Sequence, residues 1–252
     1  MITKRIAVAG KGGTGKTTLS ALLIRYLMEE RPGKSILAVD ADANANLNEA
    51  LGLEVNETIS AILEDTKNPK AVPTGMTKSV FVEYRLSQAM VEEDAFDLLV
   101  MGNPEGPGCY CYPNDLLKRY LEQVSKNYDY LVTDNEAGLE HLSRRLLPMV
   151  DWLIVTSDAT ARGIRSAGRV KEIVQKVNIG VTRMGLVIGR SRSNEGEILK
   201  EEIEKSGLNL LGFMPDDPLI SDYDLKGKAL IDLPADSPAV KASRELFEIL
   251  SL

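Results

Sequence analysis

The sequence predicts an α/β fold: one doubly wound, mainly parallel sheet of about seven or eight strands with helices on both faces. Short apolar runs recur along the whole chain, amphipathic segments separate them, and 44% of the 252 residues are hydrophobic. A strand that is covered on both faces reads as a continuous apolar run rather than as an alternation. Strands and helices that alternate in this way are typical of a parallel sheet.

Seven apolar runs are predicted to be strands, namely 6–10, 35–40, 97–102, 130–134, 152–157, 185–189 and 210–215. The first helix is expected to begin at Lys16, because Leu19, Leu22, Tyr26 and other apolar residues then share one face. Similar stripes predict further helices over 115–126, 162–177, 194–206 and 236–250.

Residues 64–96 have mixed periodicity and scattered Pro and Gly, so we expect an excursion from the sheet there. The chain shows no internal repeat, low-complexity tract or linker. A single domain over residues 1–252 is therefore the prediction.

Composition excludes several classes of protein. A formal charge of −7 disfavours a general binder of nucleic acid or anionic membranes, since both need a basic surface. No run approaches the roughly 20 apolar residues of a membrane span, and the first residues lack the apolar core of a signal peptide. Two cysteines are too few for a disulfide scaffold. We expect a cytoplasmic protein with reduced thiols and with neither nucleic acid nor membrane as a partner.

The stretch GKGGTGKTT, residues 10–18, follows the first predicted strand and opens the first predicted helix. It fits the phosphate-binding pattern G-x-x-x-x-G-K-[ST] in the context that the pattern requires. Glycines let the backbone wrap closely around phosphate oxygens, and the helix N-terminus adds its positive dipole end. Lys16 would reach the β- and γ-phosphates, and the Thr17 hydroxyl would bind Mg²⁺. The predicted nucleotide-binding residues of this loop are Gly10, Lys11, Gly12, Gly13, Thr14, Gly15, Lys16, Thr17 and Thr18.

Lys11 is an addition to the plain phosphate-binding pattern. GKGGxGKT resembles the deviant Walker A motif of the MinD/nitrogenase-iron-protein class of P-loop ATPases. The resemblance implies the MinD-like (SIMIBI) P-loop NTPase fold, ATP and ADP as ligands, and a nucleotide-dependent homodimer. It also implies that Lys11 reaches the nucleotide of the partner subunit. A cation supplied in that way would stabilise transition-state charge much as an arginine finger does.

Acidic residues stand at the ends of two predicted strands, Asp40 and Asp42 in VDADANAN and Asp134 in YLVTD. A carboxylate at such a strand end can orient the attacking water or hold Mg²⁺ through water. The same resemblance implies that Asp42 orients the water, that Asp40 is structural and that Asp134 takes the Walker B position. It places Asn46 in a first switch loop and DNEAGLEHLSRR, which begins at Asp134, in a second.

The predicted catalytic residues are therefore Lys11, Lys16 and Asp42. The predicted Mg²⁺ ligands, direct or through water, are Thr17, Asp42 and Asp134.

Both cysteines of the chain, Cys109 and Cys111, lie in GPGCYCYPND. In an extended segment, residues i and i+2 point the same way, so two thiols would face one side. Closed thiolate sites usually need about four ligands, and a twofold dimer that met here would supply them. We therefore expect Ni²⁺ or Zn²⁺ to be bound between two copies of the chain. The alternative is a pair of incidental buried residues, since free cysteine is often buried.

The deviant P-loop, the C-Y-C and DNEAGLEHLSR together resemble the CooC-type maturation ATPases, over nearly the whole chain. The resemblance implies an ATP-driven dimeric metallochaperone that assists nickel insertion into carbon monoxide dehydrogenase or acetyl-CoA synthase, with the apo-enzyme as its client. Two alternatives stay open. One is an iron–sulfur cluster carrier of the same class, and the other is a MinD-type or partition-type positioning ATPase that binds membrane or DNA.

One position departs from the pattern of these ATPases. They usually carry an asparagine after the sixth strand that reads the adenine edge, whereas this chain has Gly189. Base selectivity then rests on Arg190, on the MPDDP segment around Pro215, or on backbone groups. This departure also leaves GTP open as a ligand.

Other polar features are expected to be structural. His141, the only histidine, is expected to be packed or capping rather than a metal ligand. Arg162, Arg165 and Arg169 share one helix face, which the overall charge suggests is a solvated face. The amphipathic segment 236–250 mixes both charges on its polar face, so we expect core packing rather than a membrane anchor.

Overall fold

The computed structural model describes residues 3–66, 68, 71–103, 111–136, 149–177, 180–192 and 195–252, with the backbone alone at 111–117 and 177. Within these ranges one sheet of eight strands has the order β3-β4-β2-β5-β1-β6-β7-β8. All neighbouring pairs are parallel except β3 with β4. The strands are β1 (Lys4–Gly10), β2 (Ile36–Ala41), β3 (Val91–Glu92), β4 (Asp97–Val100), β5 (Tyr130–Asn135), β6 (Met149–Asp158), β7 (Gly180–Ser191) and β8 (Asn209–Pro215). The predicted fold class is confirmed.

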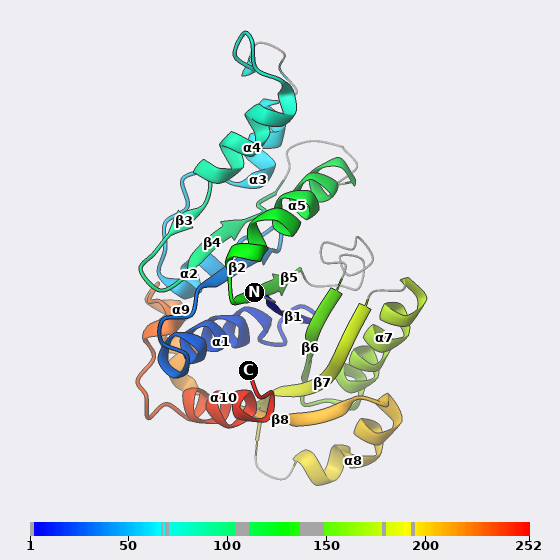
Figure 1. The fold of residues 1–252 in the computed structure, drawn as a ribbon. Helices are drawn as coiled ribbons and strands as arrows, with labels where there is room; N and C mark the ends of the chain where they lie inside the picture. The colour runs from blue at the N-terminus through cyan, green and yellow to red at the C-terminus, as the bar shows by residue number, and fades with distance from the viewer. Residues whose placement is uncertain are drawn as a thin grey trace.

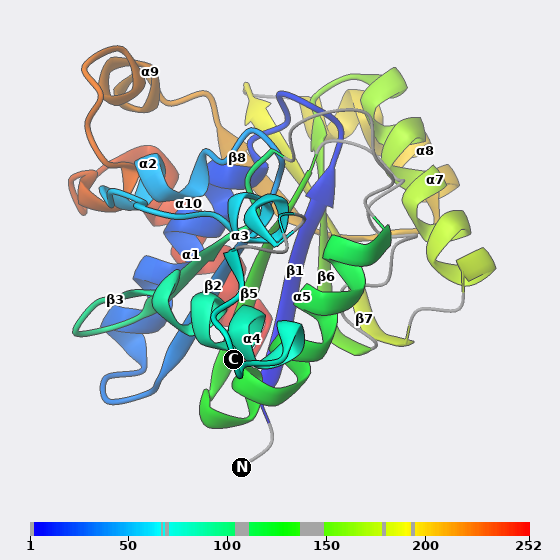
Figure 2. The same cartoon turned by 90° about the horizontal axis from the view of Figure 1, so that it is seen from above.

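Helices cover both faces of this sheet. They are α1 (Lys16–Glu30), α2 (Leu47–Leu51), α3 (Ile59–Asp65), α4 (Lys78–Gln88), α5 (Cys111–Val124), α7 (Ala161–Val177), α8 (Glu195–Ser206), α9 (Pro218–Leu225) and α10 (Pro238–Ile249), with short 3₁₀ turns η2 (Ser125–Asn127) and η3 (Leu230–Asp232). Figure 2 shows α1 and α10 on one side of β1 and β5, with α5 and α7 on the other.

The core explains why the strands read as continuous apolar runs. On β1, Ile6 and Val8 belong to the cluster under α1 and α10, whereas Ala7 and Ala9 belong to the cluster under α7 and α8. Both faces of the strand are therefore dry, and polar residues are confined to its ends.

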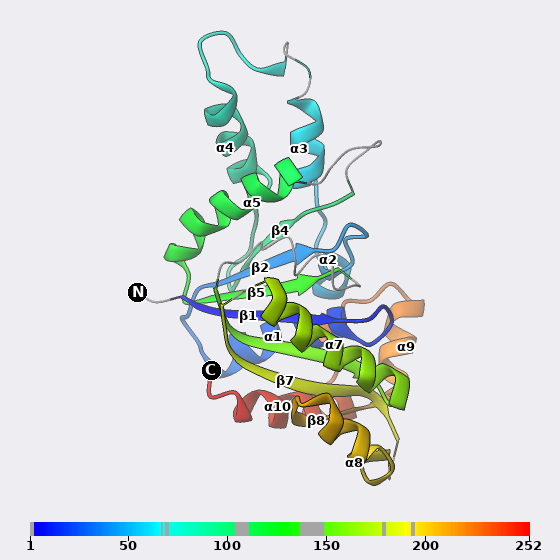
Figure 3. The ribbon, with the colours of Figure 1, turned by 90° about the vertical axis from the view of Figure 1, so that its right-hand side faces the viewer.

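The carboxyl ends of the parallel strands meet at one edge, where ligands bind in open α/β sheets. The register pairs Asp40 with Asp134 across β2 and β5, and Gly10 with Thr156 across β1 and β6. Figure 3 shows α2 and α9 at this same edge. Residues from four separate parts of the sequence are thus gathered around the loop that follows β1.

The segment expected as an excursion leaves the sheet after α2 and returns to it through β3. Figure 1 shows α3 and α4 projecting beyond the sheet at the top of the molecule. The return strand β3 pairs antiparallel with β4 and covers that edge over two residues. Sequence periodicity did not predict β3, because two residues are too short to show any period.

Core packing of the C-terminal helix is confirmed. Phe247 and Leu246 of α10 are buried, and the Phe247 ring lies 5.4 Å from the ring of Tyr26 on α1. The apolar face of α10 is therefore covered by the protein core. Among the described residues, no helix has the length and apolar character that a membrane crossing requires.

The segment around the cysteines differs from the prediction. Helix α5 begins at Cys111 rather than near residue 115, so the extended conformation expected there is wrong at Cys111. Pro113 is compatible with this because it falls in the first helical turn, where a missing N–H costs no hydrogen bond. Cys109 lies outside the described residues.

Candidate nucleotide-binding site

The loop between β1 and α1 has the conformation that its glycines permit. Gly13 and Gly15 adopt φ values of 77° and 86°, in the left-handed region that strains any residue with a Cβ. A Cβ at either position would meet nothing within 4 Å, so backbone conformation rather than space requires glycine. Gly15 is the N-cap residue of α1, which points the first N–H groups of the helix into the loop.

Thr14 braces this loop against the sheet. Its hydroxyl donates to the carbonyl of Lys11 at 2.7 Å and shares a hydrogen bond with the hydroxyl of Thr156, also at 2.7 Å. Thr156 lies on β6, and sequence reasoning did not single it out because nothing local marks it. The side chain of Thr14, which was predicted to bind nucleotide, is thus buried and serves to hold the loop in place.

The two lysines of the loop have opposite environments. Lys16 begins α1 and is only 7% exposed, whereas Lys11 lies on the surface of the loop. A buried ammonium at the end of the loop fits a partner of opposite charge within the site. The exposed side chain of Lys11 is accessible to solvent.

Asp134 anchors the first turn of α1 to β5. The Thr17 hydroxyl donates to Oδ2 of Asp134 at 2.7 Å, and the Ser20 hydroxyl donates to Oδ1 at 3.2 Å. Asp134 is 1% exposed. Burial, with a smaller contribution from the charge of Asp40, raises its pKa to about 7 against the lowering effect of Thr17, Lys16 and Ser20. A cation bound beside Asp134 would therefore strongly stabilise the ionised form of its carboxyl group.

Asp40 shapes the turn that follows β2, as the structural role predicted for it requires. Its carboxylate accepts hydrogen bonds from the backbone N–H groups of Asp42 at 3.0 Å and Leu47 at 2.8 Å. Burial raises the pKa of Asp40 to about 6, although these backbone donors oppose the shift. Asp42 accepts from Asn44 through both its backbone N–H and its side-chain amide. The turn therefore presents Asp42 next to the P-loop.

A cleft of about 760 Å³, here called the phosphate cleft, runs along the P-loop. This volume lies within the roughly 300–1,000 Å³ range of small-molecule sites. Predicted residues that line it are Gly12, Gly13, Gly15, Lys16, Thr17, Thr18, Asp42, Asn46 and Arg190. Asp224, Gly227 and Lys228 complete its far wall.

A second, smaller cavity, here called the base cavity, continues from the cleft. The predicted residues Arg190 and Pro215 line it, together with Gly189, Met214, Ile220, Ser221 and Asp224. Ile220, Ser221 and Asp224 were missed because α9 (Pro218–Leu225) was not predicted. Asp217 followed by Pro218 is the signal that could have found this helix, since a capping residue followed by proline marks a helix start.

Close packing explains why residue 189 is glycine. A Cβ there would lie 2.9 Å from the backbone carbonyl oxygen of Thr14. Any larger residue would push the P-loop away from β7. A side-chain amide at this position is therefore incompatible with the observed loop. The prediction of base contacts stays with Arg190, the segment around Pro215 and backbone groups.

The predicted Mg²⁺ ligands fit that ion chemically. Thr17, Asp42 and Asp134 offer oxygen donors, which Mg²⁺ prefers. Within the described ranges no cluster of three or more His, Cys, Asp or Glu side chains forms a metal cage. Mg²⁺ is usually held by one or two carboxylates together with substrate phosphates, so such a cage is not needed.

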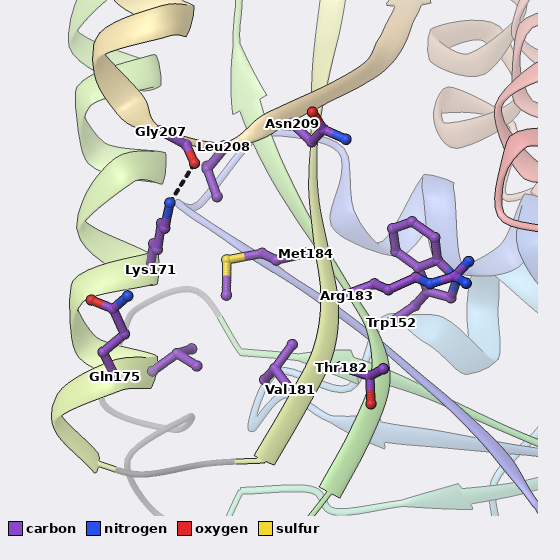
Figure 4. Close-up of a pocket in the computed structure, with 11 residues that line it drawn as sticks. Trp152, Lys171, Gln175, Val181, Thr182, Arg183, Met184, Gly207, Leu208 and Asn209 are labelled. Atoms are coloured by element: carbon purple, nitrogen blue, oxygen red, sulfur yellow. Dashed lines mark hydrogen bonds between the residues drawn. The ribbon is translucent and has the colours of Figure 1, made fainter.

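A third cavity, of about 800 Å³, lies at the opposite end of β6 and β7 (Figure 4). Arg183 stacks over the Trp152 ring at 5.5 Å, and Lys171 donates to the carbonyl of Gly207 at 2.5 Å. Because adjacent residues of a strand face opposite ways, Arg183 and Met184 lie on opposite faces of β7. The polar groups that line this cavity do not converge, so we assign no site there.

Several predicted features lie in parts of the chain that the structure does not describe. Cys109, His141 and most of the second switch stretch lie outside the described residues, and only the backbone of Cys111 is described. The thiol pair therefore stays a prediction from the sequence.

Comparison with known proteins agrees with the site. The family model of the CobQ/CobB/MinD/ParA nucleotide binding domain matches residues 6–231. An uncharacterized ATP-binding protein of Methanocaldococcus jannaschii is 40% identical over 246 residues, covering 96% of both chains. The carbon monoxide dehydrogenase accessory protein CooC of Rhodospirillum rubrum is 30% identical, covering 94% of this chain and 92% of CooC. The septum site-determining protein MinD of Pyrococcus horikoshii, solved with Mg-ADP, has the same fold, with a TM-score of 0.73 at 22% identity over 99% and 96% of the two chains.

Proposed function

The chain belongs to the CobQ/CobB/MinD/ParA family of nucleotide-binding ATPases, and we propose that it is a nickel-insertion chaperone driven by ATP. Two copies would bind one Ni²⁺ or Zn²⁺ between Cys109 and Cys111 of each chain. They would then deliver the ion to apo carbon monoxide dehydrogenase or acetyl-CoA synthase. The observation that carries this proposal is the likeness to CooC over 94% of the chain, in a sequence that has its only cysteines in a C-x-C.

The hydrolytic site supports the proposal with residues in separable roles. Backbone N–H groups of the P-loop and the Lys16 ammonium would bind the β- and γ-phosphates. Thr17, with Asp42 and Asp134, would hold Mg²⁺, which neutralises phosphate charge when it is bound. Asp42 lines the phosphate cleft beside Lys16 and would orient the attacking water.

Exposure of Lys11 supports the dimer. A lysine on the outer surface of the P-loop is free to reach toward a nucleotide in a second copy. Twofold symmetry would then bring identical surfaces together, so that each C-x-C would meet the same motif of the partner. Four thiolates at one point make a tetrahedral site of the kind that Zn²⁺ prefers and that also suits soft or borderline ions.

The test is metal stoichiometry in anaerobically purified protein loaded with Ni²⁺, measured by elemental analysis with and without ATP. We expect one ion for every two chains, together with a dimer on size-exclusion chromatography. Cys109→Ser and Cys111→Ser should each lose the ion, whereas Ser125→Ala, a matched hydroxyl removal at η2, should keep it. One ion per chain, or a thiol-free variant that still binds nickel in the dimer, would refute the shared site.

The same samples separate the alternatives. Sulfide-to-iron charge-transfer bands after reconstitution with iron and sulfide would favour a cluster carrier instead. A membrane-positioning role would need an apolar helix face free for lipid, and burial of Phe247 and Leu246 in the core argues against α10 in that role. Co-sedimentation with anionic vesicles that weakens with salt would nevertheless support such a role.

A further inference from the structure

Two buried hydroxyl groups connect the sheet to the P-loop. Thr156 on β6 is 2% exposed and Thr14 in the loop is 4% exposed, so the pair lies away from solvent. Their hydroxyl oxygens lie 2.7 Å apart, and the Thr14 hydroxyl is also 2.7 Å from the carbonyl oxygen of Lys11. A Cβ at Gly10 would clash with the side-chain and backbone oxygens of Thr156. The P-loop therefore packs directly against β6.

The number of protons determines the direction of these hydrogen bonds. A threonine hydroxyl can donate only one hydrogen bond. Both 2.7 Å bonds can form together only if Thr156 donates to Thr14 and Thr14 donates to Lys11. In the alternative, Thr14 donates to Thr156 and Thr156 donates to the carbonyl of Ala9 over a longer distance of 3.3 Å, so the Lys11 carbonyl loses this donor. The shorter bonds have the ideal length for two oxygens, and in a chain each bond strengthens the next. The favoured arrangement is thus a chain from Thr156 through Thr14 to Lys11.

This chain ends at the backbone of Lys11. The Lys11 side chain is exposed, and within the described ranges its ammonium forms no ion pair. A lysine side chain has a flexible four-carbon stem, so the region that its ammonium can reach depends on where the backbone places it. The hydrogen bond from Thr14 to the Lys11 carbonyl fixes that place relative to the sheet.

The residues expected to bind phosphate and Mg²⁺ are held in other ways. Lys16 and Thr17 belong to the first turn of α1, and the Thr17 hydroxyl donates to Asp134 at 2.7 Å. Neither residue takes part in the chain of hydroxyls. Loss of the Thr156 hydroxyl should therefore disturb Lys11 more than it disturbs these groups.

We propose that Thr156 is a positioning residue for hydrolysis, because through Thr14 it holds the backbone of Lys11 where its ammonium can reach the nucleotide of the partner subunit. The inference rests on the role of Lys11 set out under the proposed function, and it extends that role to a residue on β6. It does not depend on the metal or the client.

Steady-state phosphate release at varied ATP concentration separates kcat from KM and tests the inference. Thr156→Val replaces the hydroxyl by a methyl group of similar size. It should lower kcat about tenfold, as expected for a lost buried hydrogen bond, and change KM for ATP by less than about threefold. Thr156→Ser keeps the hydroxyl and should stay near wild type. Thr133→Val is the matched control, since Thr133 on β5 is 1% exposed and its hydroxyl has no hydrogen-bond partner among the described residues. It should keep the wild-type kcat.

The same substitution in a Lys11→Ala background distinguishes positioning from a general effect on the fold. Thr156→Val should not lower kcat further in that background, because the residue that it positions has lost its ammonium. A purely structural role would lower kcat by the same factor in both backgrounds. Thr14→Val removes the middle of the chain and should behave like Thr156→Val, so it supplies the same test if Thr156→Val does not fold.

An unchanged kcat in Thr156→Val, or an equal loss in the two backgrounds, would overturn the positioning role and leave the proposed function intact. Wild-type turnover in Lys11→Ala would overturn the proposed role of Lys11 across the dimer, and this inference with it.

Discussion

The Thr17 hydroxyl lies 2.7 Å from Oδ2 of Asp134 and donates a hydrogen bond to it. This bond joins the first turn of α1 to the end of β5, two elements far apart in the sequence. It also brings the hydroxyl and the carboxylate predicted to hold Mg²⁺ into direct contact. This hydrogen bond therefore joins the P-loop directly to the residue predicted to take the Walker B position.

Replacing Asp134 should change how stability depends on pH. Because the pKa of Asp134 is raised from 3.8 to about 7 in the fold, the folded protein keeps a proton that the unfolded chain loses in that window. Wild-type stability, without Mg²⁺ or nucleotide, should therefore fall as pH rises from about 4 to about 7. Asp134→Asn removes this effect, on the order of 4 kcal/mol at pH 8, and the remaining slope should come from Asp40. Urea unfolding from pH 5 to 8 measures this, and a variant as pH-dependent as wild type would contradict the assignment.

The two P-loop lysines should separate binding from hydrolysis. Lys16→Ala should weaken ATP binding by at least about tenfold, because it removes the buried cation of the phosphate cleft. Lys11→Ala should leave ATP affinity near wild type and reduce turnover by about 100-fold or more, because we propose that Lys11 acts on the nucleotide of the partner. Calorimetry and phosphate release measure the two quantities. Unchanged turnover in Lys11→Ala would remove its role across the dimer.

Gly189→Ala should disturb the P-loop through simple contact. The new Cβ would lie 2.9 Å from the carbonyl oxygen of Thr14, so the loop must move, at a cost of about 1–3 kcal/mol of stability. ATP affinity should fall with it. Gly33→Ala is the control, because it strains a left-handed turn residue far from the site and should lower stability alone. Equal affinity losses in both variants would show that the effect is not local.

Asp217→Ala should destabilise two helices at once. The substitution leaves the N–H groups of Leu219 and Ala239 and the hydroxyl of Ser237 without their acceptor, for a loss of about 2–4 kcal/mol in the free energy of unfolding. Asp217→Asn keeps an acceptor oxygen and should lose less. Thermal unfolding followed by circular dichroism measures both, and a neutral Asp217→Ala would contradict this double capping role.

Much of the fold could be predicted from local pattern alone. Continuous apolar runs such as IAVAG predicted the strands, because a strand that is buried on both faces needs apolar residues at every position. Asp40 and Asp134 could be placed at one edge because parallel strands end together. The contacts of Gly189 with Thr14 and of Thr14 with Thr156 could not be predicted, because each depends on how distant strands pack. Helix α9 was missed for a different reason: it has no buried residue and so leaves no apolar stripe in the sequence.

Asp217 is shared by the starts of α9 and α10, and this joins the helix that lines the base cavity to the C-terminal helix. A change that shifts α10, even on the side far from the nucleotide-binding cleft, would move the Asp217 carboxylate and α9, the helix that it caps. Altered nucleotide affinity caused by a distant substitution in the C-terminal helix would thus arise from mechanical linkage through one side chain rather than from direct contact.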